Sequence, residues 1–89
     1  MITLGSRPKR AEQVIAQKAS SDVLLFNIED GNYYSLNEIG GKIWELCDGN
    51  HSVAQVIALV ASEYETSTEE IHKDVTDLLE NLRGGKLIV

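Results

Sequence analysis

The sequence is poor in the residue types that most often carry chemistry. It contains one cysteine, one proline and 6% aromatic residues. A single cysteine excludes an intramolecular disulfide and a thiolate metal cluster. Because Cys47 follows Leu46 on the apolar side of a predicted helix, we expect it to be a buried structural thiol.

Motifs for catalysis, metals and nucleotides are absent as well. Neither His51 nor His72 has a cysteine or a second histidine at metal-ligand spacing. No nucleophile elbow, phosphate-binding glycine loop or zinc-protease motif occurs. Gly40 and Gly41 lie within a predicted helix, where close packing against a sheet would explain at least one of them. We therefore expect no cofactor, no metal site and no enzymatic activity.

Long apolar runs are also missing. No segment approaches the roughly 20 apolar residues that cross a membrane, and residues 1–8 lack an apolar core of signal-peptide length. The 89 residues allow one domain. The sequence thus predicts a cytoplasmic protein that does not contact a membrane.

Basic residues are scarce and unevenly distributed. The net charge is −6. Residues 1–18 carry four basic residues and one carboxylate, whereas the rest of the chain carries four basic residues and thirteen carboxylates. The acidic part of the chain after residue 18 repels a phosphate backbone, so we expect no nucleic-acid partner. A neutral or cationic partner fits the charge better.

The first third of the chain predicts an arm followed by strands. Residues 1–11 show no periodicity and predict a flexible N-terminal arm, which precedes one domain over residues 12–89. Segments 13–19 and 23–29 predict strands, the second more strongly because it is rich in β-branched and aromatic residues. The sequence predicts a third strand over residues 33–36.

The signal Asp30-Gly31-Asn32 predicts a hairpin between the last two strands. A three-residue loop pairs Phe26 with Leu36 and places Asn32 in the left-handed conformation. A two-residue loop would mix apolar and polar side chains on both faces. The predicted register instead collects the apolar ones on one face: Leu24, Phe26, Ile28, Tyr34 and Leu36.

Three helices are predicted after the strands. Asn37 is a suitable N-cap for the first helix, and Gly49 a suitable stop. Capping-box patterns at residues 52–55 and 67–70 begin the second and third helices, and Gly84-Gly85 ends the third. The predicted fold class is α+β, a three-stranded antiparallel sheet followed by a three-helix bundle, in a winged helix-turn-helix-like arrangement.

Two classes of binding protein fit this fold. A winged-helix DNA-binding protein has the right geometry, but its recognition helix would offer only Lys73 and Arg83 among five carboxylates. A small sheet with an unpaired edge instead accepts an extended peptide through main-chain hydrogen bonds. The acidic third helix suits a peptide that carries lysine or arginine.

The residues after the hairpin resemble a known family, the PqqD-type peptide-recognition domains of ribosomally made, modified peptides (RiPP recognition elements). The resemblance covers about residues 12–89. It is carried by Tyr33-Tyr34-Ser35-Leu36-Asn37-Glu38-Ile39-Gly40, Ile43-Trp44-Glu45-Leu46, Asp48-Gly49, Ser52-Val53, Val56, Tyr64, Asp74-Val75, Leu78-Leu79 and Leu82.

The resemblance implies a function by strand addition. Such domains bind the leader segment of a precursor peptide as an antiparallel strand beside the third strand, in a groove shared with the third helix. The residues that the resemblance assigns to peptide binding are Tyr33, Tyr34, Ser35, Leu36, Asp74, Val75, Leu78, Asn81 and Leu82.

The resemblance also implies the partner enzymes. A stand-alone chain resembles the leader-binding partner in lasso-peptide biosynthesis, where a leader peptidase and a cyclase complete maturation. The alternative within the family is a chaperone that presents a precursor to a radical-SAM enzyme in pyrroloquinoline quinone biosynthesis. The sequence leaves the oligomeric state open.

Overall fold

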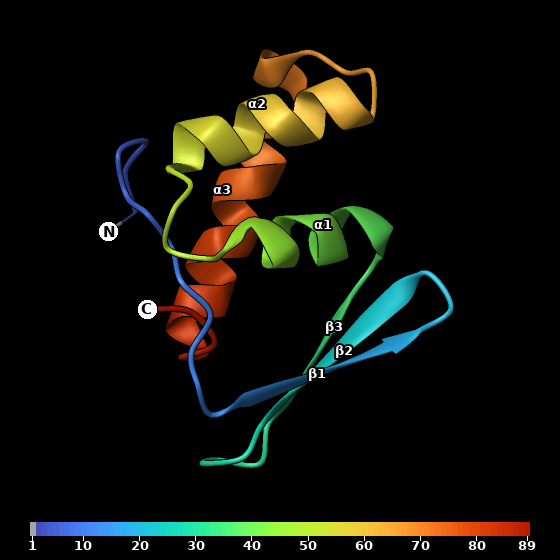
Figure 1. The fold of residues 1–89 in the computed structure, drawn as a ribbon, viewed down its shortest axis with the longest axis vertical. Coiled ribbons are helices and arrows are strands. Elements are labelled where there is room, and N and C mark those ends of the chain that lie inside the picture. Colours follow the sequence, from blue (N-terminus) through green and yellow to red (C-terminus); the bar gives the residue numbers. More distant parts are fainter. Residues whose placement is uncertain (1) are drawn as a thin grey trace.

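A computed structural model describes residues 2–89 of the chain. The strands pair as an antiparallel sheet in the order β1-β2-β3, and the helices lie on one side of it (Figure 1). This arrangement confirms the predicted α+β fold class. The elements are β1 (Val14–Ala19), β2 (Asp22–Asn27), β3 (Tyr33–Leu36), α1 (Glu38–Leu46), α2 (Val53–Glu63) and α3 (Thr68–Gly84).

The register between β2 and β3 differs from the predicted one. Phe26 lies opposite Tyr33, and Val23 lies opposite Leu36, so the predicted pairing of Phe26 with Leu36 is wrong by three positions. Because side chains alternate along a strand, an odd shift exchanges the two faces of β2. The side chains turned toward the helices are therefore Val23, Leu25, Asn27, Tyr34 and Leu36.

Asn27 explains the shift. Its side chain is 1% exposed, and its Oδ1 accepts a hydrogen bond from the backbone N–H of Glu29 at 3.0 Å. Its backbone N–H donates to the carbonyl of Asn32 at 3.0 Å, and its carbonyl accepts from Gly31 at 2.8 Å. These bonds close a longer loop than predicted, in which Gly31 rather than Asn32 has a positive φ, of 75°. Ile28 remains in that loop and is exposed.

The first two helices begin at the predicted caps. Asn37 Oδ1 accepts a hydrogen bond from the backbone N–H of Gly40 at 2.8 Å. At α2, Ser52 and Gln55 form the complete capping box, in which each side chain accepts from the other residue's backbone N–H. Both caps satisfy N–H groups that have no partner within the helix.

At α3 the predicted capping box is incomplete. Ser67 caps the helix, because its hydroxyl accepts from the backbone N–H of Glu70 at 3.1 Å. The Glu70 side chain does not return to the Ser67 backbone but accepts from Thr66 Oγ1 at 2.8 Å. The Thr66 hydroxyl therefore takes the place of the Ser67 backbone N–H as the donor to the Glu70 carboxylate.

Glycine marks the end of α3 but not of α1. Gly85 is the C-cap of α3, as predicted. Helix α1 ends at Leu46 with Cys47 as its C-cap, so the prediction that Gly49 stops the helix is wrong. Gly49 instead takes a φ of 80° in the following loop, where its N–H donates to the carbonyl of Pro8 at 3.0 Å. No helix within residues 2–89 is long and apolar enough to cross a membrane.

The two glycines of α1 allow the helix to approach the sheet. A Cβ at Gly41 would lie 2.9 Å from Val23 Cγ2, and a Cβ at Gly40 would lie 3.2 Å from Leu36 Cβ. Contacts below about 3.0 Å do not occur for real Cβ atoms. The predicted close packing against the sheet is therefore confirmed.

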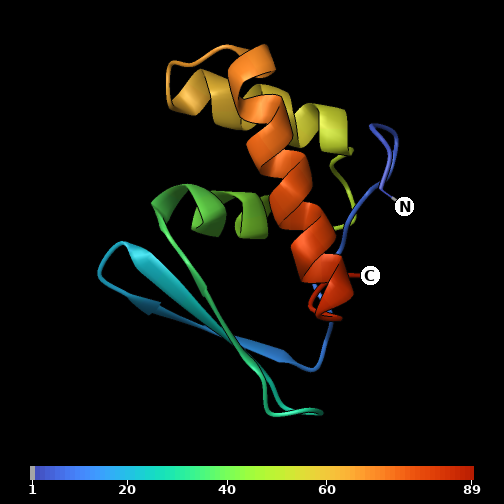
Figure 2. The same cartoon turned by 180° about the vertical axis from the view of Figure 1, so that it is seen from behind.

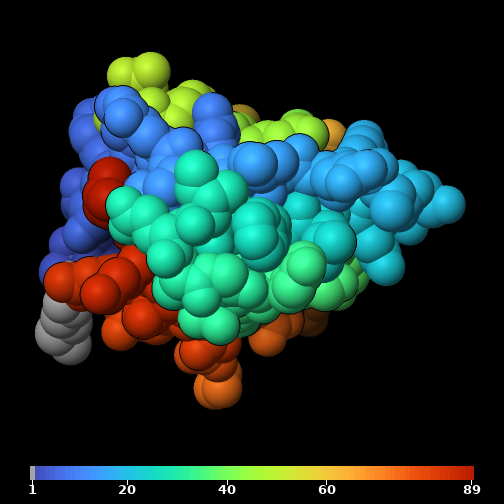
Figure 3. Space-filling view, turned by 90° about the horizontal axis from the view of Figure 1, so that it is seen from below, coloured from blue at the N-terminus to red at the C-terminus, as the bar shows by residue number. Residues whose placement is uncertain are grey.

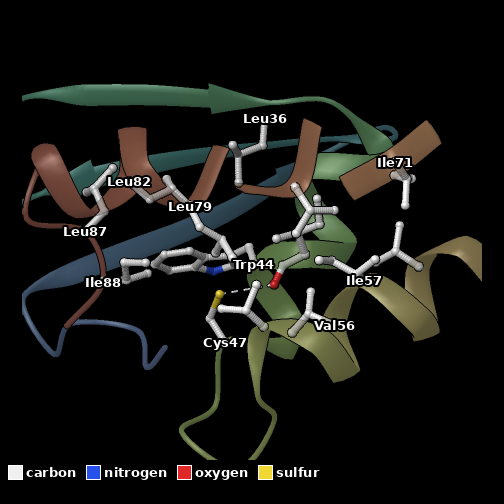
Figure 4. Packing of buried hydrophobic residues seen from close by; sticks show 14 of the residues in the cluster. Leu36, Trp44, Cys47, Val56, Ile57, Ile71, Leu79, Leu82, Leu87 and Ile88 are labelled. Atoms are coloured by element: carbon white, nitrogen blue, oxygen red, sulfur yellow. Dashed lines mark hydrogen bonds between the residues drawn. The ribbon is translucent and has the colours of Figure 1, made fainter. Parts of the chain in front are cut away.

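The core lies between the sheet and the helices (Figure 4). It combines side chains from β2, β3, all three helices and the C-terminal tail, among them Trp44, Leu79 and Ile88. Cys47 is fully buried, and its Sγ donates to the carbonyl of Ile43 at 3.3 Å. This burial confirms the expectation of a buried structural cysteine, and it raises the pKa of the thiol to about 12.

The N-terminal segment lies against the ends of two helices. The sequence predicts a flexible arm over residues 1–11. In the structure the carbonyls of Ser6 and Leu4 accept hydrogen bonds from the backbone N–H groups of Val53 and Ala54, at 2.9 Å and 3.1 Å. These N–H groups open α2 and have no partner within the helix.

The same segment also joins the C-terminus to α1. Lys9 and Val89 exchange backbone hydrogen bonds of 3.1 Å and 2.8 Å. The Arg10 guanidinium donates to the carbonyls of Trp44 and Glu45, at 3.0 Å and 2.7 Å, at the C-terminal end of α1. A cation at this end also interacts favourably with the helix dipole.

Candidate functional site

Strand β3 forms one edge of the sheet, and within residues 2–89 no strand or bridge pairs with its outer side. The backbone N–H of Asn27 donates to the carbonyl of Asn32, so these two residues form a hydrogen-bonded pair. Along an antiparallel ladder, residues alternate between pointing their N–H and C=O groups toward the partner strand and away from it. Tyr34 and Leu36 therefore bond to β2. Tyr33 and Ser35 direct their N–H and C=O groups to the open edge.

A groove of about 320 Å³ runs along the helix side of this edge. It lies between β3, the first turns of α1 and the middle of α3. Figure 2 shows these three elements from behind. Most of the lining side chains are apolar, and Asp74 is the charged residue among them. The lining residues are Tyr34, Ser35, Leu36, Asn37, Ile39, Gly40, Ile43, Asp74 and Leu78.

The structure brings together five of the residues expected to bind a peptide. Tyr34, Ser35 and Leu36 form the β3 wall of the groove, and Asp74 and Leu78 form the α3 wall. Leu78 is only partly buried, in contrast to the neighbouring core positions of α3. An unpaired main chain and an apolar groove thus lie on the same strand.

The other four expected residues lie elsewhere. Val75 and Leu82 are fully buried in the core, so their side chains face away from solvent. Asn81 is exposed on α3 outside the groove lining. Tyr33 lies on the edge, but its side chain points to the sheet face opposite the groove, beside Phe26.

Sequence reasoning missed the contribution of α1. Asn37, Ile39, Gly40 and Ile43 all line the groove. A usable signal was present, because β3 continues into α1 through Asn37 alone. With so short a connection, the first turn of the helix must lie beside the strand it follows. The helical spacing of Ile39 and Ile43 places both on one face.

A larger hollow of about 480 Å³ lies between α1, α2 and the β1–β2 turn. Its lining includes charged residues of both signs, and Lys42 Nζ lies 3.5 Å from Glu63 Oε1. It does not adjoin β3 and offers few apolar contacts. We therefore regard the smaller groove at the open edge as the candidate site.

The two histidines lie in different parts of the fold. Within residues 2–89, no group of three or more histidine, cysteine, aspartate or glutamate side chains is arranged to hold a metal ion. His51 Nδ1 lies 2.9 Å from Asp48 Oδ1 in the loop after α1. His72 is exposed on α3.

Comparisons with known proteins identify solved structures of the same fold. No curated protein matches the chain. Two solved structures share its fold. One, described as TbiB1 in complex with the TbiA(beta) leader peptide, has a TM-score of 0.80 and 22% identity over 90% of this chain and 93% of that chain. The other, lasso peptide synthetase B1 complexed with the leader peptide, has a TM-score of 0.81 and 20% identity over 94% and 99%.

A family profile gives the assignment. The profile described as Coenzyme PQQ synthesis protein D (PqqD) matches residues 22–88. The match extends from β2 to the C-terminal tail, so it includes β3, α1 and α3, which form the groove. The chain therefore belongs to the PqqD family.

Proposed function

We propose that this protein binds the leader segment of a ribosomally synthesised precursor peptide and delivers it to a processing enzyme. The observation that carries the proposal is the open edge of β3 beside an apolar groove. Both similar solved structures are described as complexes with leader peptides, which supports the same use of the fold here. Binding occurs by addition of the leader as a fourth, antiparallel strand.

In the proposed complex, the open edge and the groove contact different parts of the leader. Its main chain pairs with the outward N–H and C=O groups of Tyr33 and Ser35. Alternate side chains then enter the groove between Tyr34 and Leu78, where apolar side chains lose contact with water. Asp74 at the rim favours a lysine or arginine in the leader, through a contribution that salt screens.

The protein acts by tethering and performs no chemistry of its own. Ordering a flexible leader costs about 2–5 kcal/mol, which main-chain pairing and apolar contacts in the groove offset. A bound precursor then has a high effective concentration near the enzyme that holds the complex. Since precursors are made by ribosomes, we place this step in the cytoplasm, with neither membrane nor nucleic acid as a partner.

Two recipients are supported by different observations. The structural likeness to lasso peptide synthetase B1 favours a leader peptidase and cyclase. The family profile, named for coenzyme PQQ synthesis, favours presentation to a radical-SAM enzyme instead. Co-purification of the complex with each enzyme encoded near the chain distinguishes the two, because only the true recipient is retained together with the precursor.

A direct titration tests binding. The neighbouring reading frames are first searched for a short precursor peptide; its fluorescently labelled N-terminal half is the probe, and the readout is fluorescence anisotropy. We expect saturable binding of the probe and no binding of duplex DNA, because the body is acidic. Strong DNA binding without peptide binding would support the winged-helix alternative.

A matched pair of proline substitutions tests the role of the edge. Ser35→Pro removes an N–H that points away from the ladder, so the fold tolerates it. Ala16→Pro removes the corresponding N–H on the opposite edge, where β1 has β2 as its only partner strand among residues 2–89. We expect Ser35→Pro to weaken peptide binding about tenfold or more, and Ala16→Pro to leave it unchanged. Equal effects would mean that the peptide does not pair with β3.

A second pair tests the groove. Leu78→Asp places a charge in the apolar wall, at a position of α3 that is partly rather than fully buried. Leu59→Asp makes the same change at an exposed position of α2, remote from the groove. The first variant should lose peptide affinity and the second should retain it, provided that circular dichroism shows both to be folded.

A further inference from the structure

The sheet face turned away from the helices carries a row of side chains that crosses all three strands. Ile15 lies opposite Phe26, and Phe26 lies opposite Tyr33. The Phe26 and Tyr33 ring centroids are 5.0 Å apart, with ring planes tilted by 48°. Figure 3 looks onto this side of the molecule. We name Ile15, Phe26 and Tyr33 the outer row.

The outer row is exposed and ends at the open edge. Ile15 is 57% and Tyr33 69% exposed. With Gln17 and Leu24, the row surrounds a shallow hollow of about 210 Å³. Tyr33 is the last member on β3, and its own N–H and C=O point outward at the same position. The row therefore stops at the place where an added strand would begin.

An antiparallel strand paired with β3 extends this row by one residue. The peptide residue that exchanges hydrogen bonds with Tyr33 has its Cα about 5.5 Å away and its side chain on the same face. We call this position p. The preceding residue, p−1, lies opposite Tyr34 and faces the groove. The residue p−2 lies opposite Ser35 and faces outward again.

We propose that Tyr33 selects the outward-facing side chain of the bound peptide, so that an aromatic or β-branched residue at position p becomes the fourth member of the outer row. The inference rests on the proposed strand addition. It adds selection of the peptide side chains that face outward to selection of those that enter the groove. The occupant is the peptide itself because the exposed row leads, through Tyr33, directly to the edge where the peptide main chain pairs. Cross-strand pairs of aromatic and β-branched residues favour each other over alanine.

A selection experiment tests this inference with the full chain. A random library of displayed peptides is enriched on the wild-type protein, on Tyr33→Lys and on Leu59→Lys, which introduces the same charge at an exposed apolar position of α2. Parallel enrichment on Ser35→Pro identifies binders that depend on the edge. Edge-dependent peptides from the wild type and from Leu59→Lys should share an aromatic or β-branched residue at p. Tyr33→Lys should replace it with aspartate or glutamate while leaving p−1 unchanged.

Binding measurements with one enriched peptide then test the coupling between its residue p and Tyr33. Alanine at p should weaken binding to the wild type about two- to fivefold, and the loss should disappear on Tyr33→Ala. An unchanged preference at p on Tyr33→Lys would overturn the inference while leaving strand addition intact. Peptides that bind the wild type and Ser35→Pro equally would instead overturn strand addition itself. A dimer of the free protein that Tyr33→Lys abolishes in sedimentation would assign the outer row to a second copy.

Discussion

At the scale of single residues, Gly41 shows how one missing side chain sets the distance between α1 and the sheet. We expect Gly41→Ala to lower the free energy of unfolding by about 1–3 kcal/mol, because its Cβ would overlap Val23. Gly84→Ala is the control, since among residues 2–89 the added Cβ would meet no heavy atom within 4 Å beyond its chain neighbours and the helix's own backbone. It should be neutral or stabilising by up to about 1 kcal/mol. Urea denaturation measures the free energy of unfolding of both variants. In a protein that already carries Val23→Ala, Gly41→Ala should cost less stability, because the overlapping methyl group is gone.

Asp48 gives a second prediction at this scale. Its Oδ1 accepts from the backbone N–H of Asn50 at 2.8 Å and lies 2.9 Å from His51 Nδ1. The first contact, then the second, lowers the pKa of the carboxyl below its ordinary value of 3.8. The unfolded chain therefore takes up this proton first, so the stabilisation is complete above pH 3.8 and is lost as the pH falls below it.

Asp48→Asn tests this pH dependence, because it keeps an acceptor oxygen and removes the charge. The wild type should be the more stable protein at neutral pH, and the difference should shrink as the pH falls through the window below 3.8. Thermal unfolding across this range measures the difference. A difference that stays constant with pH would show that the Asp48 charge contributes nothing to stability.

At the scale of elements, the sequence located every helix start and failed at one register. The caps Asn37, Ser52 and Ser67 act within a few residues of themselves, so their effect is visible in a local pattern. The β2–β3 register depends instead on a polar residue, Asn27, that is buried with its hydrogen bonds satisfied. A hydrophobic pattern assigns such a residue to the solvent face. Because side chains alternate along a strand, the prediction then placed every side chain of β2 on the wrong face.

The N-terminal segment carries a prediction about α2. Its carbonyls accept from the backbone N–H groups of Val53 and Ala54, which have no partner within the helix. Deleting residues 1–8 should therefore speed amide hydrogen exchange at these two positions and lower the melting temperature. Exchange at Val60, inside the same helix, is the internal reference. If the intact chain already exchanges Val53 and Ala54 as fast as the deletion variant does, the segment is the flexible arm that its sequence predicts.

At the scale of the whole molecule, the family and the strand could be predicted, but the groove could be predicted only in part. Tyr34, Leu36 and Leu78 were identified because the resemblance names the strand and helix that form the groove. Helical spacing alone did not separate Leu78, at the edge of the buried stripe, from Val75 inside it. That separation depends on how α3 lies against β3, which is a property of tertiary packing.

Peptide binding should stabilise the whole domain and protect particular amides. At a peptide concentration about 100 times Kd, mass action adds about 2.7 kcal/mol to the free energy of unfolding. For a domain of this size that raises Tm by roughly 10–20 °C. Because Tyr33 and Ser35 direct their N–H groups to the open edge, their amides should exchange quickly in the free protein and slowly in the complex.

The neighbouring residues provide the control for the same measurement. Tyr34 and Leu36 already bond to β2, so their amides should be protected with or without peptide. An alternating pattern therefore distinguishes strand addition from a general rise in stability, which would slow all four amides together. Protection that appears on β1 instead, at Ala16 and Lys18, would place the peptide on the opposite edge, because these residues direct their N–H groups away from β2.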